Sequence, residues 1–285
     1  IKSRAVDKTG NQQDPPAEIT VTVRVPITIK VPSDQPTIQS AINVATFGDT
    51  VLVAPGTYFE NINFGRKAIT VTSENGPQVT IIDGRNADPV VIFTSGEGRD
   101  SILNGFTLQN GRSGFNNQGF GEGGGITVQR SSPTITKNVI KNNQACHGGG
   151  IGIGFGSPLI QLNTITGNGN NACSGGDGGG ISIRGAASAE ILDNVISDNG
   201  MSSSDGGGIS MFAAGTPSIK RNVIKGNSTG GQGGGIWMVN FSDALNIQNL
   251  IVGNQASVGG GHYWLVPSGP RGPILVNNTI ADNNA

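Results

Sequence analysis

Charge is scarce in this chain. Asp, Glu, Lys and Arg together make up 13% of it, against roughly 25% in an ordinary globular domain. The net charge is -1, and the 18 Lys and Arg residues are scattered rather than clustered. A protein that binds nucleic acid or an anionic membrane concentrates basic residues on one surface. The sequence therefore argues against both partners.

Long apolar runs and metal-binding motifs are also missing. No run of about 18 apolar residues occurs, so no membrane insertion is expected. The N-terminus lacks the basic and then apolar pattern of a signal peptide, so we take the chain to start after any export signal. With only two histidines and two cysteines there is no zinc-binding spacing, and we find neither a nucleotide-binding loop nor a nine-residue calcium-roll repeat.

Glycine, in contrast, is abundant, at 47 of 285 residues, more than twice the usual share of roughly 7%. Much of it lies in triplets that recur every 25 to 30 residues, and a fixed period of this size is typical of a solenoid. We expect each triplet at a turn that needs positive φ or close backbone stacking. The six triplets, each with its next residue, are Gly123–Ile126, Gly148–Ile151, Gly178–Ile181, Gly206–Ile209, Gly233–Ile236 and Gly259–His262.

Each repeat also holds two asparagines five residues apart. The six pairs are Asn138 and Asn143, Asn163 and Asn168, Asn194 and Asn199, Asn222 and Asn227, Asn249 and Asn254, and Asn278 and Asn283. Short alternating stretches between these marks predict three strands and three turns per repeat. The repeats show no helical period, so we predict an all-β parallel β-helix with apolar ladders inside and Asn at the corners. We expect a left-handed backbone at the asparagines.

The part of the chain before residue 123 is less regular. Six strands, forming two coils, are predicted at residues 50–54, 62–64, 68–73, 79–82, 90–94 and 102–108. Ahead of them Ile38, Ala41, Ile42 and Ala45 share one helical face. Pro36 suits the first turn of such a helix and Gly48 its end. We predict an N-terminal helix that caps the open end of the solenoid.

Two stretches resemble a known superfamily. The run Gln35–Ile42, then Gly48–Tyr58, is similar to the start of pectin-lyase-like right-handed parallel β-helix proteins, as are residues 82–84 and 105–108. The resemblance spans about residues 31–285 and implies a right-handed β-helix of the secreted bacterial surface type. It does not fix the activity, because the superfamily includes lyases, hydrolases, epimerases and non-catalytic surface proteins.

Residues 1–30 form a separate segment in this interpretation. Residues 5–11 and the alternating Thr and Val of residues 18–25 resemble the last strand of a bacterial immunoglobulin-like surface domain, or a linker strand. The β-helix then covers 31–285 and ends in mid-coil. We expect further domains of the same longer chain, possible self-association at the open C-terminal coil, and a secreted or cell-surface location.

The two cysteines, Cys146 and Cys173, fall in matching loops of successive repeats. Stacking of the coils would bring them within disulfide range. A bridge closing about 27 residues would stabilise the fold by roughly 3 to 4 kcal/mol. The alternative is two unpaired thiols.

The position just before each glycine triplet carries titratable groups. Adjacent carboxylates in one ladder share a proton or hold a cation such as Ca²⁺. We predict a calcium site from Glu122, Asp177 and Asp205, with Arg184, or less favourably His147, as the base that removes a proton from a uronate. The alternative is a set of polar loop residues facing water. The position reads Glu122, His147, Asp177, Asp205, Gln232 and Val258.

Aromatic residues gather in the strand that follows the triplets, toward the C-terminal coils. Phe212, Trp237 and Tyr263 are expected to face outward and form a trough for sugar rings, with Arg184 pairing a uronate carboxylate. Alternatively, these rings pack beneath a loop or a later part of the chain. His262 takes a position that is otherwise Ile, and we expect it in the core or at the end coil.

Two functions remain open on this basis. The outer strand face lacks the Asp or Glu pair that glycoside hydrolysis requires, so an enzyme of this type would be a polysaccharide lyase rather than a hydrolase. We expect an extracellular polysaccharide-binding module whose catalysis, where present, is calcium-assisted uronate cleavage. The alternative is a non-catalytic surface or adhesin stalk, because the Gly-Gly-X-Ile and Asn repeats resemble those of bacterial surface and autotransporter passenger proteins.

Overall fold

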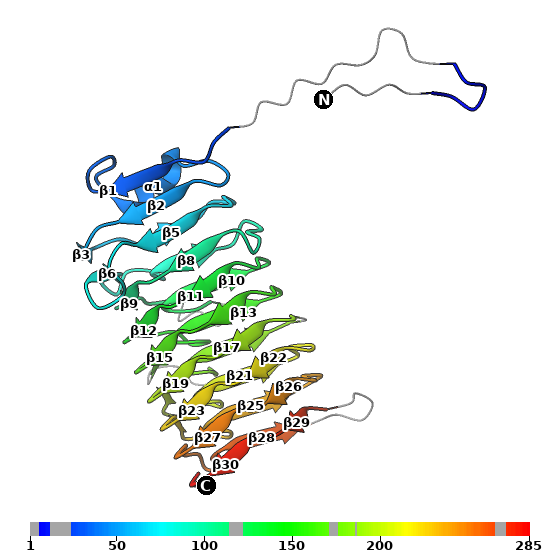
Figure 1. Ribbon diagram of the computed structural model, residues 1–285. Helices are drawn as coiled ribbons and strands as arrows, with labels where there is room; N and C mark the ends of the chain where they lie inside the picture. The colour runs from blue at the N-terminus through cyan, green and yellow to red at the C-terminus, as the bar shows by residue number, and fades with distance from the viewer. Residues whose placement is uncertain (1–5, 12–23, 114–121, 171–175, 186, 266–271) are drawn as a thin grey trace.

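The protein is a parallel β-solenoid in which one coil stacks on the next (Figure 1). The computed structural model describes residues 6–11, 24–113, 122–170, 176–185, 187–265 and 272–285. Every strand pairing among these residues is parallel, and each coil contributes one strand to each of three long sheets. The predicted all-β fold is confirmed.

The three long sheets are numbered here in the order in which the chain visits them within a coil. Sheet 1 comprises β1 (Thr28–Val31), β2 (Thr50–Val53), β5 (Thr70–Ser73), β8 (Ile102–Asn104), β11 (Thr134–Thr136), β14 (Leu159–Gln161), β18 (Glu190–Leu192), β22 (Ser218–Lys220), β26 (Leu245–Ile247) and β29 (Ile274–Val276). Sheet 2 comprises β3 (Gly56–Tyr58), β6 (Thr80–Asp83), β9 (Thr107–Gln109), β12 (Val139–Lys141), β15 (Thr164–Thr166), β19 (Val195–Ser197), β23 (Val223–Lys225), β27 (Leu250–Val252) and β30 (Thr279–Ala281).

Sheet 3 comprises β4 (Ile62–Asn63), β7 (Val91–Phe93), β10 (Ile126–Gln129), β13 (Ile151–Gly154), β17 (Ile181–Arg184), β21 (Ile209–Phe212), β25 (Ile236–Val239) and β28 (His262–Leu265). A fourth, short sheet was not predicted. It comprises β16 (Gly169–Asn170), β20 (Gly200–Met201) and β24 (Ser228–Thr229), and it lies between sheets 2 and 3 along the chain.

The first coils differ from the sequence prediction in two places. Residues 102–108 form two strands rather than one, because Gly105 turns the chain at φ +81° between β8 and β9. Residues 56–58 form β3, which pairs with β6 and was not predicted. The error arose from expecting one strand in each apolar run, whereas three-residue strands leave little periodicity to detect.

The core is a stack of apolar side chains that point into the solenoid. In sheet 3 the first and third residues of each strand point inward, and residues such as Ile151, Ile153, Ile181 and Ile183 are fully buried. Parallel pairing places Ile151 beside Ile181 and Ile153 beside Ile183, so identical side chains pack against one another in successive coils. The alternate residues face outward, as the alternation predicted.

The two asparagine ladders occupy the corners on either side of sheet 2, and each side-chain amide joins three coils. Asn168 is typical: its Oδ1 accepts from the backbone N–H of Asn143, and its Nδ2 donates to the Ile140 carbonyl and to Oδ1 of Asn199, at 2.8 to 3.1 Å. These amides therefore satisfy buried backbone groups at the corners, where the sheet ladders are interrupted.

The expectation of a left-handed backbone at these asparagines was wrong by one residue. The residue before each ladder asparagine is left-handed instead, because it turns the corner and leaves the asparagine free to point its amide inward. These preceding residues, with φ between +52° and +64°, are Lys137, Asn142, Leu162, Gly167, Asp193, Asp198, Arg221, Gly226, Gln248, Gly253, Asn277 and Asp282.

The glycine triplets serve the two purposes that were predicted for them. Gly148 begins its triplet at φ +70°, where a side chain would be strained. A Cβ on Gly149 would lie 2.4 Å from the backbone nitrogen of Gly169, and one on Gly150 would lie 2.6 Å from the Gly180 carbonyl oxygen. The triplet thus permits a turn and close contact with the next coil.

The predicted helix is present as α1 (Ile38–Val44), which packs against β1, β2 and β4. Ile38, Ala41 and Ile42 are buried, as expected. The helix begins two residues after Pro36 and ends four residues before Gly48, since Thr37 is its N-cap and Ala45 its C-cap. The carboxylate of Glu60 accepts the N–H groups of Ile38 and Gln39, which fixes the helix on the first coil.

The N-terminal segment joins the solenoid through a buried carboxylate. The Asp49 carboxylate accepts hydrogen bonds from both terminal guanidinium nitrogens of Arg24, at 2.6 and 2.8 Å, and from the backbone N–H of Ile27. β1 follows at Thr28, so pairing begins just before the expected boundary at residue 31. Most of the stretch likened to an immunoglobulin-like strand, residues 12–23, lies outside the described residues. The described helix is too short to cross a membrane.

Candidate functional site

Part of the titratable file before the glycine triplets forms a ladder, from His147 to Asp205. His147 pairs with Asp177 and Asp177 with Asp205 through parallel bridges, and Gln232 pairs with Val258 further along. The chain then folds at each triplet, so that this file lies against the outward side of sheet 3. Register alone therefore places a histidine and two aspartates on consecutive coils.

Asp177 is the centre of a buried polar network. Its Oδ1 lies 3.0 Å from Nδ1 of His147 and accepts the hydroxyl of Ser182 at 2.7 Å, while its Oδ2 lies 3.7 Å from Nη2 of Arg184. Burial alone would raise the pKa of Asp177. The bond from His147, the charge of Arg184 and the Ser182 hydroxyl outweigh burial, so the pKa lies below its usual value. Asp177 is therefore an anion at neutral pH.

The contact between His147 and Arg184 is a stack rather than a pair of hydrogen bonds. One guanidinium nitrogen lies 2.8 Å from Nδ1 and 2.7 Å from Nε2 of the same ring. The two ring nitrogens point in different directions, so one atom this close to both must lie against the ring. An anionic Asp177 fixes the Nδ1 proton of His147. Arg184 lies near the same carboxylate, with Nη2 3.7 Å from Oδ2 of Asp177, and its role as a base stays a prediction.

The predicted calcium ligands do not gather in one cluster within the described residues, and the calcium site stays a prediction. Asp205 turns the other way from Asp177 and accepts the backbone N–H of Gln232 at 2.7 Å. Burial and the nearby Asp177 raise the pKa of Asp205, only partly offset by that bond. Among the residues that the structure describes, no three His, Cys, Asp or Glu side chains gather closely enough to hold a metal. Calcium prefers free carboxylate oxygens, whereas those of Asp177 already face a histidine, a serine and an arginine.

Glu122 lies apart from the aspartates, at a hollow over the N-terminal coils of sheet 3. This hollow has a volume of about 710 Å³. Its lining includes Asn63, Asp88, Ile92, Arg112, Glu122 and Gln129.

The aromatic residues of the predicted trough fall into two groups. Trp237 is paired in register with Tyr263 in one outward ladder. Phe212 lies beside Arg184 in the other, with the guanidinium carbon 5.1 Å from the ring centroid. Trp237 is only 8% exposed, and its indole N–H donates to Oε1 of Gln232 at 3.3 Å. The segment before the triplet thus covers Trp237, and the rings do not form one open surface.

The disulfide prediction remains a prediction. Cys146 is buried beside the file, directly before His147. Its expected partner, Cys173, lies outside the described residues.

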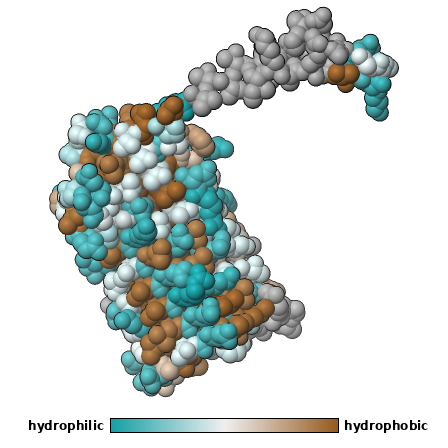
Figure 2. Space-filling model, in the orientation of Figure 1, coloured by the Kyte–Doolittle hydropathy of each residue, from teal (hydrophilic) through white to brown (hydrophobic). Residues whose placement is uncertain are grey.

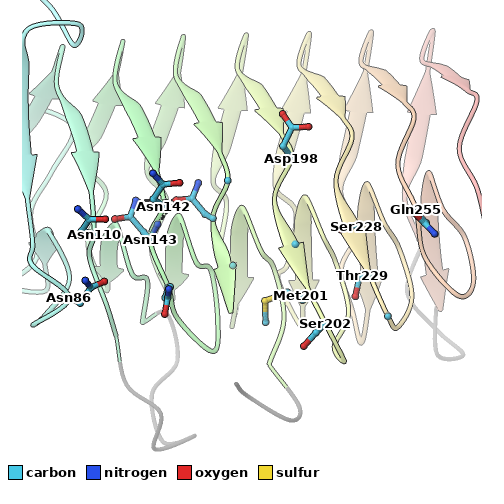
Figure 3. A pocket seen from close by; sticks show the side chains of 16 residues that line it. Asn86, Asn110, Asn142, Asn143, Asp198, Met201, Ser202, Ser228, Thr229 and Gln255 are labelled. Carbon is cyan, nitrogen blue, oxygen red and sulfur yellow. Dashed lines mark hydrogen bonds between the residues drawn. The ribbon is translucent and has the colours of Figure 1, made fainter. Parts of the chain in front are cut away.

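A second open recess in the described surface was not predicted. It is a groove with a volume of about 1090 Å³ that follows the corner after the second asparagine ladder, alongside the short sheet (Figure 3). Successive coils contribute to it, so it runs along the solenoid. Its lining comprises Asn86, Asn110, Asn142, Asn143, Gln144, Gly167, Asn168, Gly169, Asp198, Gly200, Met201, Ser202, Ser228, Thr229, Gly230 and Gln255.

The groove exists because two of its middle coils carry no side chain at one repeated position. The residue after the second ladder asparagine is Gln144, then Gly169, Gly200, Ser228 and Gln255 in successive coils. Two glycines in the middle of this row leave a floor of bare backbone between longer polar residues. The only sequence signal was this interruption of one ladder, and it becomes visible once the register is known.

Comparison with known proteins found several similar solved structures. No curated protein matches the chain. Among solved structures, a pectin methylesterase in complex with a hexasaccharide is 12% identical, with a TM-score of 0.39 over 89% of this chain and 94% of that one. A mutant pectin methylesterase in complex with another hexasaccharide gives 10% identity and a TM-score of 0.38, with the same coverage. ORF18 of Geobacillus virus E2 is 14% identical, with a TM-score of 0.43 over 90% of this chain and 60% of that one.

The sequence also matches a family model, and over a longer stretch than any single motif. The model describes a right-handed β-helix region, and residues 81–256 match it. That stretch holds the glycine triplets up to Gly233 and five of the six asparagine pairs. The chain therefore belongs to the right-handed β-helix family.

Proposed function

We propose that this protein binds an extended polysaccharide in the groove beside the short sheet. The observation that carries the proposal is the groove's direction and length, since successive coils line it from Asn86 to Gln255. A linear glycan has the same extended, repeating form. An extracellular location is part of the same proposal.

The lining suits sugar hydroxyl groups. Asn142, Gln144 and Gln255 are exposed, and each side-chain amide can donate and accept hydrogen bonds. Ser202 and Ser228 add exposed hydroxyls to the lining. The bare backbone at the glycines of the floor allows a sugar ring to approach closely.

The charge of the groove favours a neutral glycan. Asp198 is the one charged side chain among its lining residues, and no lysine or arginine belongs to that set. An anionic chain of uronates would meet repulsion there rather than a counter-ion. We therefore propose a neutral polysaccharide as the ligand of the groove. The Asp177 network takes no part in this proposed binding.

The test is a panel of neutral and uronate polysaccharides, with and without calcium, read by binding and by the absorbance of unsaturated products. We expect calcium-independent binding of a neutral glycan without product. The double variant Gln144→Ala and Gln255→Ala removes both glutamine amides of the lining and should weaken binding at least about tenfold, or 1.4 kcal/mol. Gln78→Ala is the matched control, because Gln78 is also exposed but lies outside the lining.

Three outcomes would contradict the proposal. Equal binding by the double variant and the wild-type protein would place the ligand elsewhere. Calcium-dependent formation of unsaturated product would indicate a lyase. Silence with every glycan would favour the structural stalk.

A further inference from the structure

The groove beside the short sheet repeats with the coils of the solenoid. Its lining residues come from seven consecutive coils, in the turns that follow β6, β9, β12, β15, β19, β23 and β27 (Figure 3). Neighbouring strands of a sheet lie about 4.8 Å apart, so these turns form a line about 29 Å long. A ligand that follows the groove therefore meets the groups of a new coil about every 4.8 Å.

The two glycines in the middle of the groove differ in how strictly the fold requires them. Gly169 has no room for a side chain, because a Cβ there would lie 1.7 Å from the Gly200 carbonyl oxygen. A Cβ on Gly200 would lie 3.1 Å from the Ser228 hydroxyl oxygen, which can rotate away, and 3.4 Å from the Ser228 carbonyl oxygen. The φ of Gly200 also lies outside the left-handed region. Neither packing nor backbone conformation therefore requires glycine at position 200.

A glycine that the fold does not require needs another explanation. Glycine in a strand loses more conformational entropy on folding than alanine does. In return, its bare backbone lets a ligand approach closely. Gly200 lines the groove at its middle coils, so the missing side chain keeps the floor open where a bound chain would cross it.

The spacing of the coils distinguishes neutral glycans by the distance that each sugar adds to the chain. In a β-1,4-linked chain of glucose or mannose, both linkages leave the ring equatorially. Such a chain is nearly straight, and each sugar advances it by about one strand spacing, or about 4.8 Å. Chains of α-1,4-linked or β-1,3-linked glucose bend at each linkage and coil, so each sugar advances them by less. Only the straight chain places successive sugars beside successive coils.

We propose that the ligand of the groove is a straight, β-1,4-linked neutral glycan with one sugar beside each coil, one of them on the bare floor at Gly200. This inference rests on the proposed function of the groove and specifies the linkage of its ligand. Asn142, Asp198 and Ser228 are exposed in the turns of three different coils, where each contacts a different sugar. The length of the groove corresponds to about six or seven sugars.

The experiment measures the affinity of oligosaccharides of two to eight sugars in four series. These are β-1,4-linked glucose, β-1,4-linked mannose, α-1,4-linked glucose and β-1,3-linked glucose. We expect the affinity of at least one β-1,4 series to rise with each added sugar and to level off at about six or seven. At six sugars, that series should bind at least about tenfold more tightly than both coiled series.

The variant Gly200→Ala tests the floor of the groove. The added methyl group should weaken binding of the six-sugar ligand at least about fivefold, with no fall in the thermal midpoint. Gly98→Ala is the matched control, because Gly98 lies outside the lining and also has room for a side chain. A Cβ there would lie 3.3 Å from Oδ1 of Asp100, at a φ outside the left-handed region. This control should bind like the wild-type protein.

Several results would overturn the inference while the proposed function of the groove stands. They are equal affinity for a coiled series, an affinity that stops rising before four sugars, and binding of another neutral glycan but of neither β-1,4 series. Wild-type binding by Gly200→Ala, or a fall of its thermal midpoint, would likewise overturn the role of the floor. Failure of every neutral glycan to bind would contradict the proposed function itself.

Discussion

At the scale of single residues, each of these corners of the solenoid is built by two neighbouring residues with different roles. The residue before each ladder asparagine takes the left-handed conformation, and it can be Lys, Leu, Asp or Gly. The asparagine itself keeps an ordinary backbone and supplies the hydrogen bonds. The sequence predicted the ladders because asparagine recurs at a fixed spacing. It did not show which residue turns the corner, since that position has no constant residue type.

Asn199 offers a direct test of this division. Its Oδ1 accepts from the backbone N–H of Asn168 at 3.0 Å, and its Nδ2 donates to the Ile165 carbonyl at 2.9 Å. Asn199→Ala leaves both groups buried without a partner, and we expect a loss of about 2 to 4 kcal/mol in unfolding free energy. Urea unfolding measures it. Asn142→Gly, at an exposed left-handed position, is the control, and an equal loss there would contradict the ladder's role.

At the scale of the sheet strands, alternation predicted which side chains enter the core but not which outward side chains stay open to solvent. Ser182 and Ser210 face outward from sheet 3 and are nevertheless fully buried. The segment before each triplet folds back over them, as the bond from Ser182 to Asp177 shows. Whether such an outward side chain is covered depends on contacts between segments of one coil. The periodicity of the sequence carries no information about these contacts. Trp237 is hidden for the same reason.

The strand β28 carries a histidine where its neighbours carry isoleucine. His262 stacks on Ile236, and neither of its ring nitrogens has a hydrogen-bond partner within the described part of the chain. Burial lowers its pKa from 6.5 to about 4. The unfolded chain therefore binds a proton more readily than the folded one between these values, so stability should fall as the pH drops from about 6.5 toward 4.

Hydrogen exchange of the β28 amides as a function of pH measures this effect. We expect faster exchange, corrected for the intrinsic pH dependence, below about pH 6. His262→Ile should abolish the effect and slow exchange at all pH values, because it restores the side chain found in the coil before. A pH response that survives in His262→Ile would assign it to another group.

At the scale of the whole molecule, each coil contacts mainly its neighbours, so stability is close to a sum of local terms. Figure 2 shows polar and apolar side chains intermixed over the visible face, with an apolar patch on the part formed by the C-terminal coils. Trp264 and Leu265 are half-exposed or more in this region. The fold class was predictable from the sequence because the strand and turn pattern, weak in any one repeat, recurs in every repeat. The groove was not, because it arises from side chains that are missing in adjacent coils.

This arrangement predicts a gradient of local stability along the 285-residue chain. The coil that contains β28, β29 and β30 pairs with one described coil, whereas the coil that contains β13, β14 and β15 pairs with two. In a protein that ends at Ala285, we expect the amides of the first set to exchange faster by at least about tenfold, since opening them breaks one interface rather than two. Uniform exchange in both sets would indicate a single cooperative unit.

The coils differ in length at one point of the repeat. Each asparagine pair keeps its spacing of five residues, whereas the stretch from the second asparagine to the next triplet ranges from five residues at Asn143 to ten at Asn168. Extra residues at this point leave the pairing of the three long sheets intact. Every coil thus offers an insertion point beside the groove, where foreign peptides could be grafted, or natural selection could alter ligand preference, while the supporting frame stays the same.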